Sequence, residues 1–116
     1  MIEDITVPHG AVCTNAAGEL TLAETALVLK RARLFLGSDS GPAFLASAVA
    51  TPVVALYGPA DIYRWTPPAT LAPRVNIFHQ APTNPCRHQV CPERRPCMSL
   101  ITVEEVWDAC ARLWRE

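Results

Sequence analysis

Four consecutive residues, Asp39-Ser40-Gly41-Pro42, combine an acid, a hydroxyl, a glycine and a proline between two apolar segments. If a strand precedes them and a helix follows, they lie at a helix N-terminus, where free backbone N–H groups bind phosphate. Gly41 lets a ligand approach the backbone, and Asp39 can accept hydrogen bonds from sugar hydroxyls. The alternative is structural, because the first two residues can cap the helix while Gly41 and Pro42 form the turn.

The elements around this turn are predicted to form an α/β fold. Apolar runs predict strands over 11–15, 33–39, 51–58 and 74–79. Helices are predicted over 21–32, 41–50 and 102–116. Thr21 and Thr102 are each followed three residues later by a glutamate, the spacing of a capping box that begins a helix. Strands without a polar face, separated by helices, indicate a parallel sheet covered on both sides.

Composition excludes several classes of protein. With 116 residues, half of them hydrophobic, and a net charge of −1, the chain fits a single domain, 1–116, and has no general attraction for nucleic acid. No apolar run reaches the roughly 18 residues of a transmembrane segment. The start is acidic and contains Pro8, which is unlike a secretory signal, so a cytoplasmic location is expected.

The stretch LFLGSDSGPAFLASAVATPVVALYGPADIYRW, residues 34–65, resembles the C-terminal domain of glycosyltransferase family 9, the heptosyltransferases. The resemblance is in the order of an Asp-Ser-Gly turn, a short helix, an apolar strand, a Gly-Pro-Ala-Asp turn and a tryptophan. It extends to NAAGELTLAETALVLKRA before this stretch and CPERRPCMSLITVEEV after it. It implies a GT-B fold of two Rossmann-like domains and heptose transfer from ADP-heptose to a lipopolysaccharide core acceptor, with this chain as part of the C-terminal domain.

The resemblance also implies roles for individual residues. The amides around Ser40 and Gly41 would meet the donor diphosphate, Asp39 the sugar, and the turn at 18–20 the adenine. The donor-binding candidates are therefore Gly18, Glu19, Leu20, Asp39, Ser40, Gly41 and Pro42. Phe44, Gly58 and Asp61 are further candidates, and Arg64 and Trp65 are weaker ones. Phe44 stands where family members usually have histidine. No cofactor is implied.

Family members are much longer than this chain, and their N-terminal acceptor domain, which supplies the acidic general base, has no counterpart here. We therefore expect a nucleotide-diphosphate sugar as partner, no catalytic residue in this chain and no transfer by it alone. The alternative is a non-catalytic binding or assembly module that keeps the fold. A strand at 11–15 without its neighbour would leave an exposed sheet edge, which predicts a homo-oligomer, with Trp107 and Trp114 as docking residues, or pairing with a separate N-terminal domain.

The five cysteines are an odd number in a chain without an export signal, so reduced thiols are expected. Cys86, Cys91 and Cys97, with His79 or His88, are weak candidates for a zinc site, because the usual two-residue spacing is absent. We expect no metal there. Cys13 and Cys110 are predicted to be small core residues.

Overall fold

A three-stranded parallel sheet lies at the centre of the computed structural model, which describes residues 10–58, 62–79 and 96–114. Its strands β1 (Phe35–Ser38), β2 (Val53–Leu56) and β3 (Arg74–Ile77) have the order β1-β2-β3. The register places Val53 between Phe35 and Arg74. The first three residues of β2 are buried, as is typical of a central parallel strand. The predicted parallel α/β sheet is confirmed.

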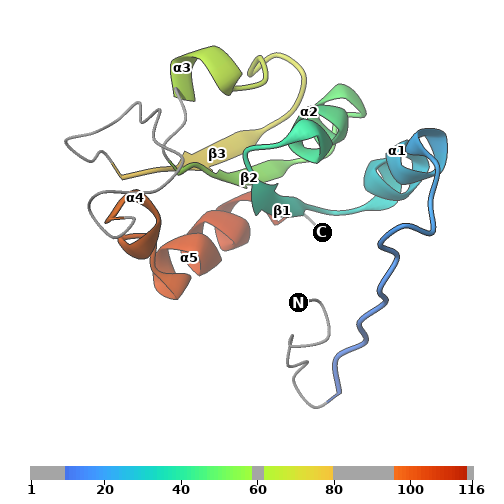
Figure 1. Ribbon diagram of the computed structural model, residues 1–116, viewed down its shortest axis with the longest axis horizontal. Helices are drawn as coiled ribbons and strands as arrows, with labels where there is room; N and C mark the ends of the chain where they lie inside the picture. Colours follow the sequence, from blue (N-terminus) through green and yellow to red (C-terminus); the bar gives the residue numbers. More distant parts are fainter. Residues whose placement is uncertain (1–9, 59–61, 80–95, 115–116) are drawn as a thin grey trace.

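Helices lie on both faces of this sheet (Figure 1). They are α1 (Leu22–Arg31), α2 (Gly41–Ala48), α3 (Ile62–Trp65), α4 (Pro96–Ser99) and α5 (Val103–Leu113). On one face, Ala43 and Ala46 of α2 pack against Val53, Ala55 and Tyr57. On the other, Ala109 and Leu113 of α5 pack against Val54 and Ile77. Among the described residues, no helix is long and apolar enough to cross a membrane.

Threonines cap α1 and α5 as their spacing predicts. The Thr21 side chain accepts a hydrogen bond from the Glu24 N–H at 3.3 Å, and Glu24 Oε2 accepts one from the Thr21 N–H at 2.7 Å. The Thr21 N–H and the Thr21 hydroxyl both donate to the Glu24 carboxylate and so lower its pKa. At α5, Thr102 accepts from the Glu105 N–H at 3.2 Å, but Glu105 Oε2 contacts His79 Nε2 at 2.8 Å. The second glutamate therefore ties α5 to the end of β3.

The predicted strand at 11–15 is wrong. This segment runs away from the sheet, and Val12 is 95% exposed. The Asn15 side chain accepts a hydrogen bond from the Ala17 N–H at 3.0 Å, which turns the chain at the end of the segment. Its short apolar run has no strand beside it in the described part of the chain, so nothing holds it extended. In the described part of the chain, β1 is consequently the edge strand on this side of the sheet.

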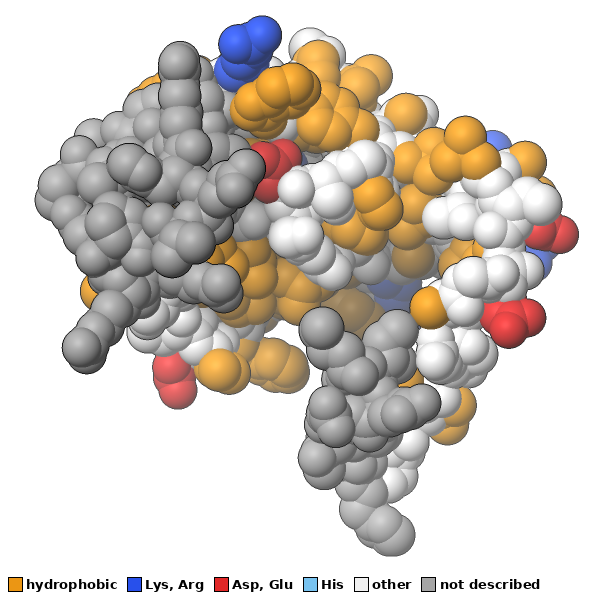
Figure 2. Space-filling view, viewed as in Figure 1, with side chains coloured by type: hydrophobic (Ala, Val, Ile, Leu, Met, Phe, Trp, Pro, Cys, Tyr) orange, Lys and Arg blue, Asp and Glu red, His pale blue; other side chains and the backbone are white. Residues whose placement is uncertain are grey.

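An apolar groove lies between β1 and α5. Helix α5 contacts β2 and β3, so the side chains of β1 on this face lack a helical cover. Leu36 is 49% exposed and Trp107 is 72% exposed. The groove has a volume of about 970 Å³ and is lined by Leu34, Leu36, Leu56, Met98, Ile101, Thr102, Val103, Val106, Trp107, Cys110, Ala111 and Trp114. Figure 2 shows hydrophobic side chains gathered over α5 and β1.

Helix α2 ends in a Schellman motif that holds an alanine in a left-handed conformation. The Thr51 N–H donates to the Ala46 carbonyl at 2.9 Å and the Ala50 N–H to the Ser47 carbonyl at 3.0 Å. Ala50 has φ of 65°, a region in which an L-residue is disfavoured and glycine is usual. The motif brings the chain directly from α2 into β2.

Replacing Ala50 by glycine is therefore expected to stabilise the protein. The left-handed conformation costs an L-residue roughly 1–2 kcal/mol, and glycine removes this cost. The greater conformational freedom of glycine in the unfolded chain offsets about half of the resulting stabilisation. We expect A50G to raise the free energy of unfolding by about 0.5–1 kcal/mol in urea titrations. Ala111→Gly, at an exposed position within α5, should lower it by about 1 kcal/mol, and a similar loss in A50G would contradict the assignment.

Candidate functional site

A second, smaller cavity lies at the carboxyl end of the sheet. Its volume is about 370 Å³, and it is lined by Asp39, Ser40, Gly41, Phe44 and Trp65. Four of these residues were donor-site candidates from the sequence, and Trp65 was a weaker one. They come from the turn after β1, from the first turn of α2 and from α3. The structure therefore brings the Asp-Ser-Gly turn and two aromatic rings to one place.

The parallel pairing of β1 with β2 positions Asp39. Strand β1 ends at Ser38, and the Asp39 N–H donates one more ladder hydrogen bond to the Leu56 carbonyl at 3.0 Å. Ser40 is still extended, and α2 begins at Gly41, with Pro42 in its first turn. The carboxyl edge of the strands is where open α/β sheets bind their ligands.

The N-terminus of α2 has no side-chain cap. Ser40 occupies the capping position, but its hydroxyl donates to the Ser38 carbonyl at 3.1 Å instead of accepting from the helix. The Ala43 N–H is bonded to the Ser40 carbonyl, and Pro42 has no N–H. In the described part of the chain, the backbone N–H groups of Ser40 and Gly41 have no partner. Helix capping therefore does not explain this turn.

Charge in the cavity comes mainly from Asp39. Partial burial raises the pKa of its carboxyl group, and no salt bridge within the described ranges compensates for that burial. The pKa of the nearby Tyr57 is also raised, chiefly by burial and further by the negative charge of Asp39. The Arg64 guanidinium lies 5.4 Å from the centroid of the Trp65 ring, so a cation stands beside the cavity wall.

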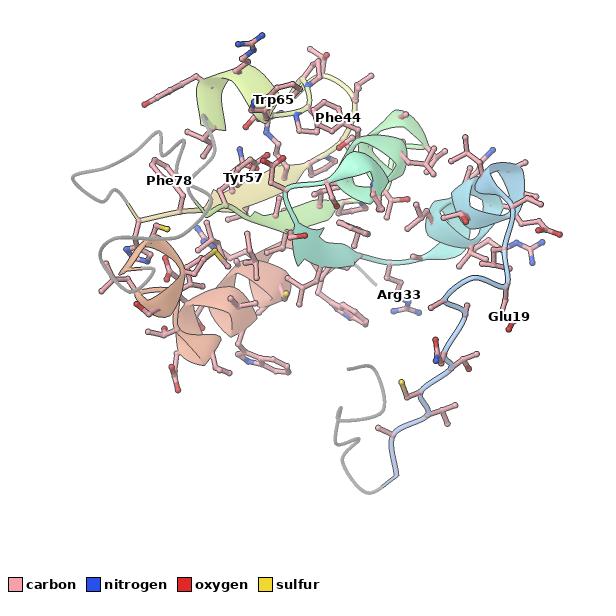
Figure 3. All side chains as sticks on the ribbon, in the orientation of Figure 1. Glu19, Arg33, Phe44, Tyr57, Trp65 and Phe78 are labelled. Atoms are coloured by element: carbon pink, nitrogen blue, oxygen red, sulfur yellow. The ribbon has the colours of Figure 1, made fainter. Side chains whose placement is uncertain are left out.

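The remaining donor-site candidates lie elsewhere. The turn Gly18-Glu19-Leu20 precedes α1 and does not line the cavity, and Figure 3 shows Glu19 well away from Phe44 and Trp65. Gly18 has φ of 76°, which accounts for a glycine there. A side chain on Gly58 would meet the Met98 sulfur at 2.9 Å, so this position faces α4. Pro42 is exposed beside the cavity, and Asp61 lies outside the described residues.

The cysteines are distributed over several environments. Cys97 is buried in α4, and Cys110 is half-buried against the core, which raises the pKa of its thiol. Cys13 is exposed, so its prediction as a core residue is wrong, because the segment that carries it leaves the sheet. Cys86 and Cys91, like His88, lie outside the described residues. Within those residues, no three potential metal ligands gather, and the zinc alternative is untested.

Comparison with known proteins bears on this cavity. The family model described as glycosyltransferase family 9 (heptosyltransferase) matches residues 2–96, which include the whole Asp-Ser-Gly turn and α3. The chain belongs to glycosyltransferase family 9. The family resemblance seen in the sequence is thereby confirmed. No solved structure gives a significant match.

Individual relatives in this family are lipopolysaccharide heptosyltransferases. The chain is 33% identical over 107 residues to lipopolysaccharide heptosyltransferase 3 of Escherichia coli K12, which covers 89% of this chain and 29% of that protein. A second E. coli heptosyltransferase 3 is 43% identical over 54 residues, 47% of this chain and 16% of the relative. Lipopolysaccharide heptosyltransferase 2 of Salmonella typhimurium is 37% identical over 65 residues, which are 56% of this chain and 18% of that relative. The chain thus spans less than a third of the length of these relatives.

The raised pKa of Asp39 predicts a pH-dependent stability. Between the ordinary value of 3.8 and the higher pKa of the folded protein, the folded state binds more protons than the unfolded state. The free energy of unfolding should therefore fall as pH rises through this interval. D39N has no carboxyl group to titrate, so its free energy of unfolding should lack this fall. The difference in the free energy of unfolding between D39N and wild type, measured by urea titration, should therefore favour D39N more at pH 7 than at pH 3. An equal difference at both pH values would contradict the burial of the charged group.

Proposed function

We propose that this chain binds the nucleotide-sugar donor of a family 9 glycosyltransferase, an ADP-heptose-like molecule used in lipopolysaccharide core synthesis. The observation that carries the proposal is the uncapped start of α2, which opens into a cavity shared with Asp39. Family membership supplies the class of ligand, a nucleotide sugar. The predicted cytoplasmic location and the role of the chain as part of a C-terminal donor domain belong to the same proposal.

The donor diphosphate is assigned to the turn before α2. The N–H groups of Ser40 and Gly41 donate to its oxygens, and the positive end of the α2 dipole favours its negative charge. Pro42 provides no donor, so the number of amide contacts is small. The exposed Arg64 side chain beside Trp65 supplies a positive charge at the rim of the same cavity. No metal ion enters this scheme.

Asp39 is assigned to the sugar. Its carboxylate accepts hydrogen bonds from hydroxyl groups, which would offset the cost of partly burying it. During transfer, the acceptor hydroxyl loses its proton and attacks the anomeric carbon while the bond to the diphosphate breaks. The amides at Ser40 and Gly41 stabilise the departing diphosphate. We assign no residue of this chain as the base, and we expect donor binding without transfer by this chain alone.

A substitution at Gly41 tests the diphosphate site. Nothing lies within 4 Å of the position where a Cβ would stand on Gly41, so G41V should fold while its side chain fills the cavity. We expect ADP binding in calorimetry to weaken at least about tenfold, equivalent to 1.4 kcal/mol. Ala48→Val, at the exposed other end of α2, is the matched control and should bind ADP as wild type does. Unchanged ADP affinity in G41V would refute the site.

The alternative, an assembly module, is favoured by the apolar groove, and we propose that a second copy of the chain occupies it. The outer edge of β1 has no strand beside it in the described ranges. Two such edges can pair antiparallel across a two-fold axis normal to the sheet. Both α5 helices then lie on one face, and the two grooves join into a single apolar space that Trp107 of each copy can fill.

Sedimentation velocity at micromolar concentration tests self-association. We expect wild type to sediment as a dimer and Leu36→Lys to sediment as a monomer, because a lysine at the sheet edge opposes pairing and leaves a charge in the groove. Tyr63→Lys, at a 93% exposed position on α3, is the control and should remain dimeric. A wild-type monomer under these conditions would rule out this interface without affecting the donor site.

A further inference from the structure

We infer that Trp65 and Phe44 form two aromatic walls that hold the sugar ring of the donor, and that Tyr57, Thr66 and Asn76 position Trp65 for this contact. The inference rests on the proposed function, since it takes the diphosphate to lie at the start of α2. It goes further by naming the part of the donor that the rest of the cavity recognises.

Two rings from different elements flank one small cavity. Phe44 lies on α2 and is 38% exposed, whereas Trp65 lies on α3 and is 50% exposed. Figure 3 shows the two side chains near each other above the sheet, and both line the same cavity as Asp39. The cavity thus brings two partly exposed rings and a carboxylate together, and a ligand with both apolar faces and hydroxyl groups would contact all three.

Trp65 is held by a chain of polar contacts that begins inside the protein. The Tyr57 side chain is 1% exposed, and its hydroxyl donates to the Trp65 carbonyl oxygen at 3.3 Å. The Thr66 hydroxyl lies 3.3 Å from the Tyr57 hydroxyl and accepts a hydrogen bond from Asn76 Nδ2 at 3.4 Å. Asn76 belongs to β3. These contacts fix the backbone carbonyl of Trp65, and with it the end of α3, to the sheet, so the core sets the position of this residue at the cavity.

The chemistry of the cavity favours a sugar over a nucleobase. Its volume of about 370 Å³ is near the lower end of the ~300–1,000 Å³ range of ligand cavities, so it holds one ring beside the diphosphate. A sugar ring presents C–H groups on its faces and hydroxyls at its edge. The faces suit Phe44 and Trp65, neither of which offers a hydrogen bond from its ring face, and the hydroxyls suit the Asp39 carboxylate. Phe44 selects for the least polar part of the sugar.

Comparing ADP with ADP-heptose by calorimetry tests the assignment. We expect F44A and W65A each to weaken ADP-heptose binding roughly 3- to 10-fold, the range of aromatic contact energies, while ADP affinity is unchanged. Phe78→Ala removes a similarly exposed ring, 40% accessible, outside the cavity and is the matched control. Circular dichroism confirms that each variant is folded.

The outcomes separate this inference from the proposed function. Equal losses for ADP and ADP-heptose would assign the rings to the nucleoside and overturn the inference. Unchanged ADP-heptose affinity in both variants would overturn it too, while ADP binding that depends on Gly41 would still support the diphosphate site. Wild type that binds neither molecule would refute the proposed function itself.

Thr66 variants test the positioning chain. T66V removes the hydroxyl that contacts Tyr57 and Asn76, and we expect it to lower the preference for ADP-heptose over ADP and to shift the Trp65 indole signal in NMR spectra. T66S keeps the hydroxyl and should restore both. If T66V keeps the wild-type preference while W65A loses it, Trp65 contacts the sugar without help from this chain of residues.

Discussion

Burial of β2 on both faces is the constraint on which the remaining structure depends. Val53, Val54 and Ala55 are 1%, 0% and 0% exposed, so the strand needs a strand on either side and helices above and below. Parallel neighbours can be reached only through crossover segments, and α2 provides the crossover from β1 to β2. The same geometry places the turn at 39–41 and α3 beside each other at the carboxyl edge. Core packing thus builds the cavity without a dedicated loop.

The two faces of the sheet differ in how completely they are covered. The face with α2 carries small residues, Ala43 and Ala46, that bring the helix close to the strands and leave its first turn open to the cavity. On the other face, α5 is displaced toward β3, and β1 stays uncovered. The cavity beside Asp39 and the apolar groove are therefore on different sides of one strand, so a substitution in one leaves the lining of the other unchanged.

Patterns of neighbouring residues predicted the elements with regular periodicity. The three apolar runs that became β1, β2 and β3, and the helices begun by Thr21 and Thr102, were found from local spacing alone. The run at 11–15 has the same local pattern but no strand beside it, and only tertiary contacts decide this difference. Short helices such as α3 carry too few residues for a period to be recognised.

The lining of the cavity at the carboxyl end of the sheet was predicted in part for the same reason. Asp39, Ser40, Gly41 and Phe44 are near one another in sequence, so one motif identified them together, whereas Trp65 joins them only through the fold. One local signal in the sequence could have made Trp65 a stronger site candidate. Tyr57 is a hydroxyl-bearing side chain at the end of an apolar strand, and such a group needs a polar partner when buried. The structure supplies that partner at the backbone of Trp65.

The uncovered groove also affects the thermodynamics of the monomer. Leu36, Trp107 and Trp114 are 49%, 72% and 54% exposed in the folded state, so unfolding brings less new apolar surface into water than the chain length implies. The heat-capacity change of unfolding should lie below the ~12–15 cal/mol/K per residue typical of globular proteins. A smaller heat-capacity change flattens the dependence of stability on temperature. If a partner covered the groove, burial of this apolar surface would appear as a negative heat-capacity change of association.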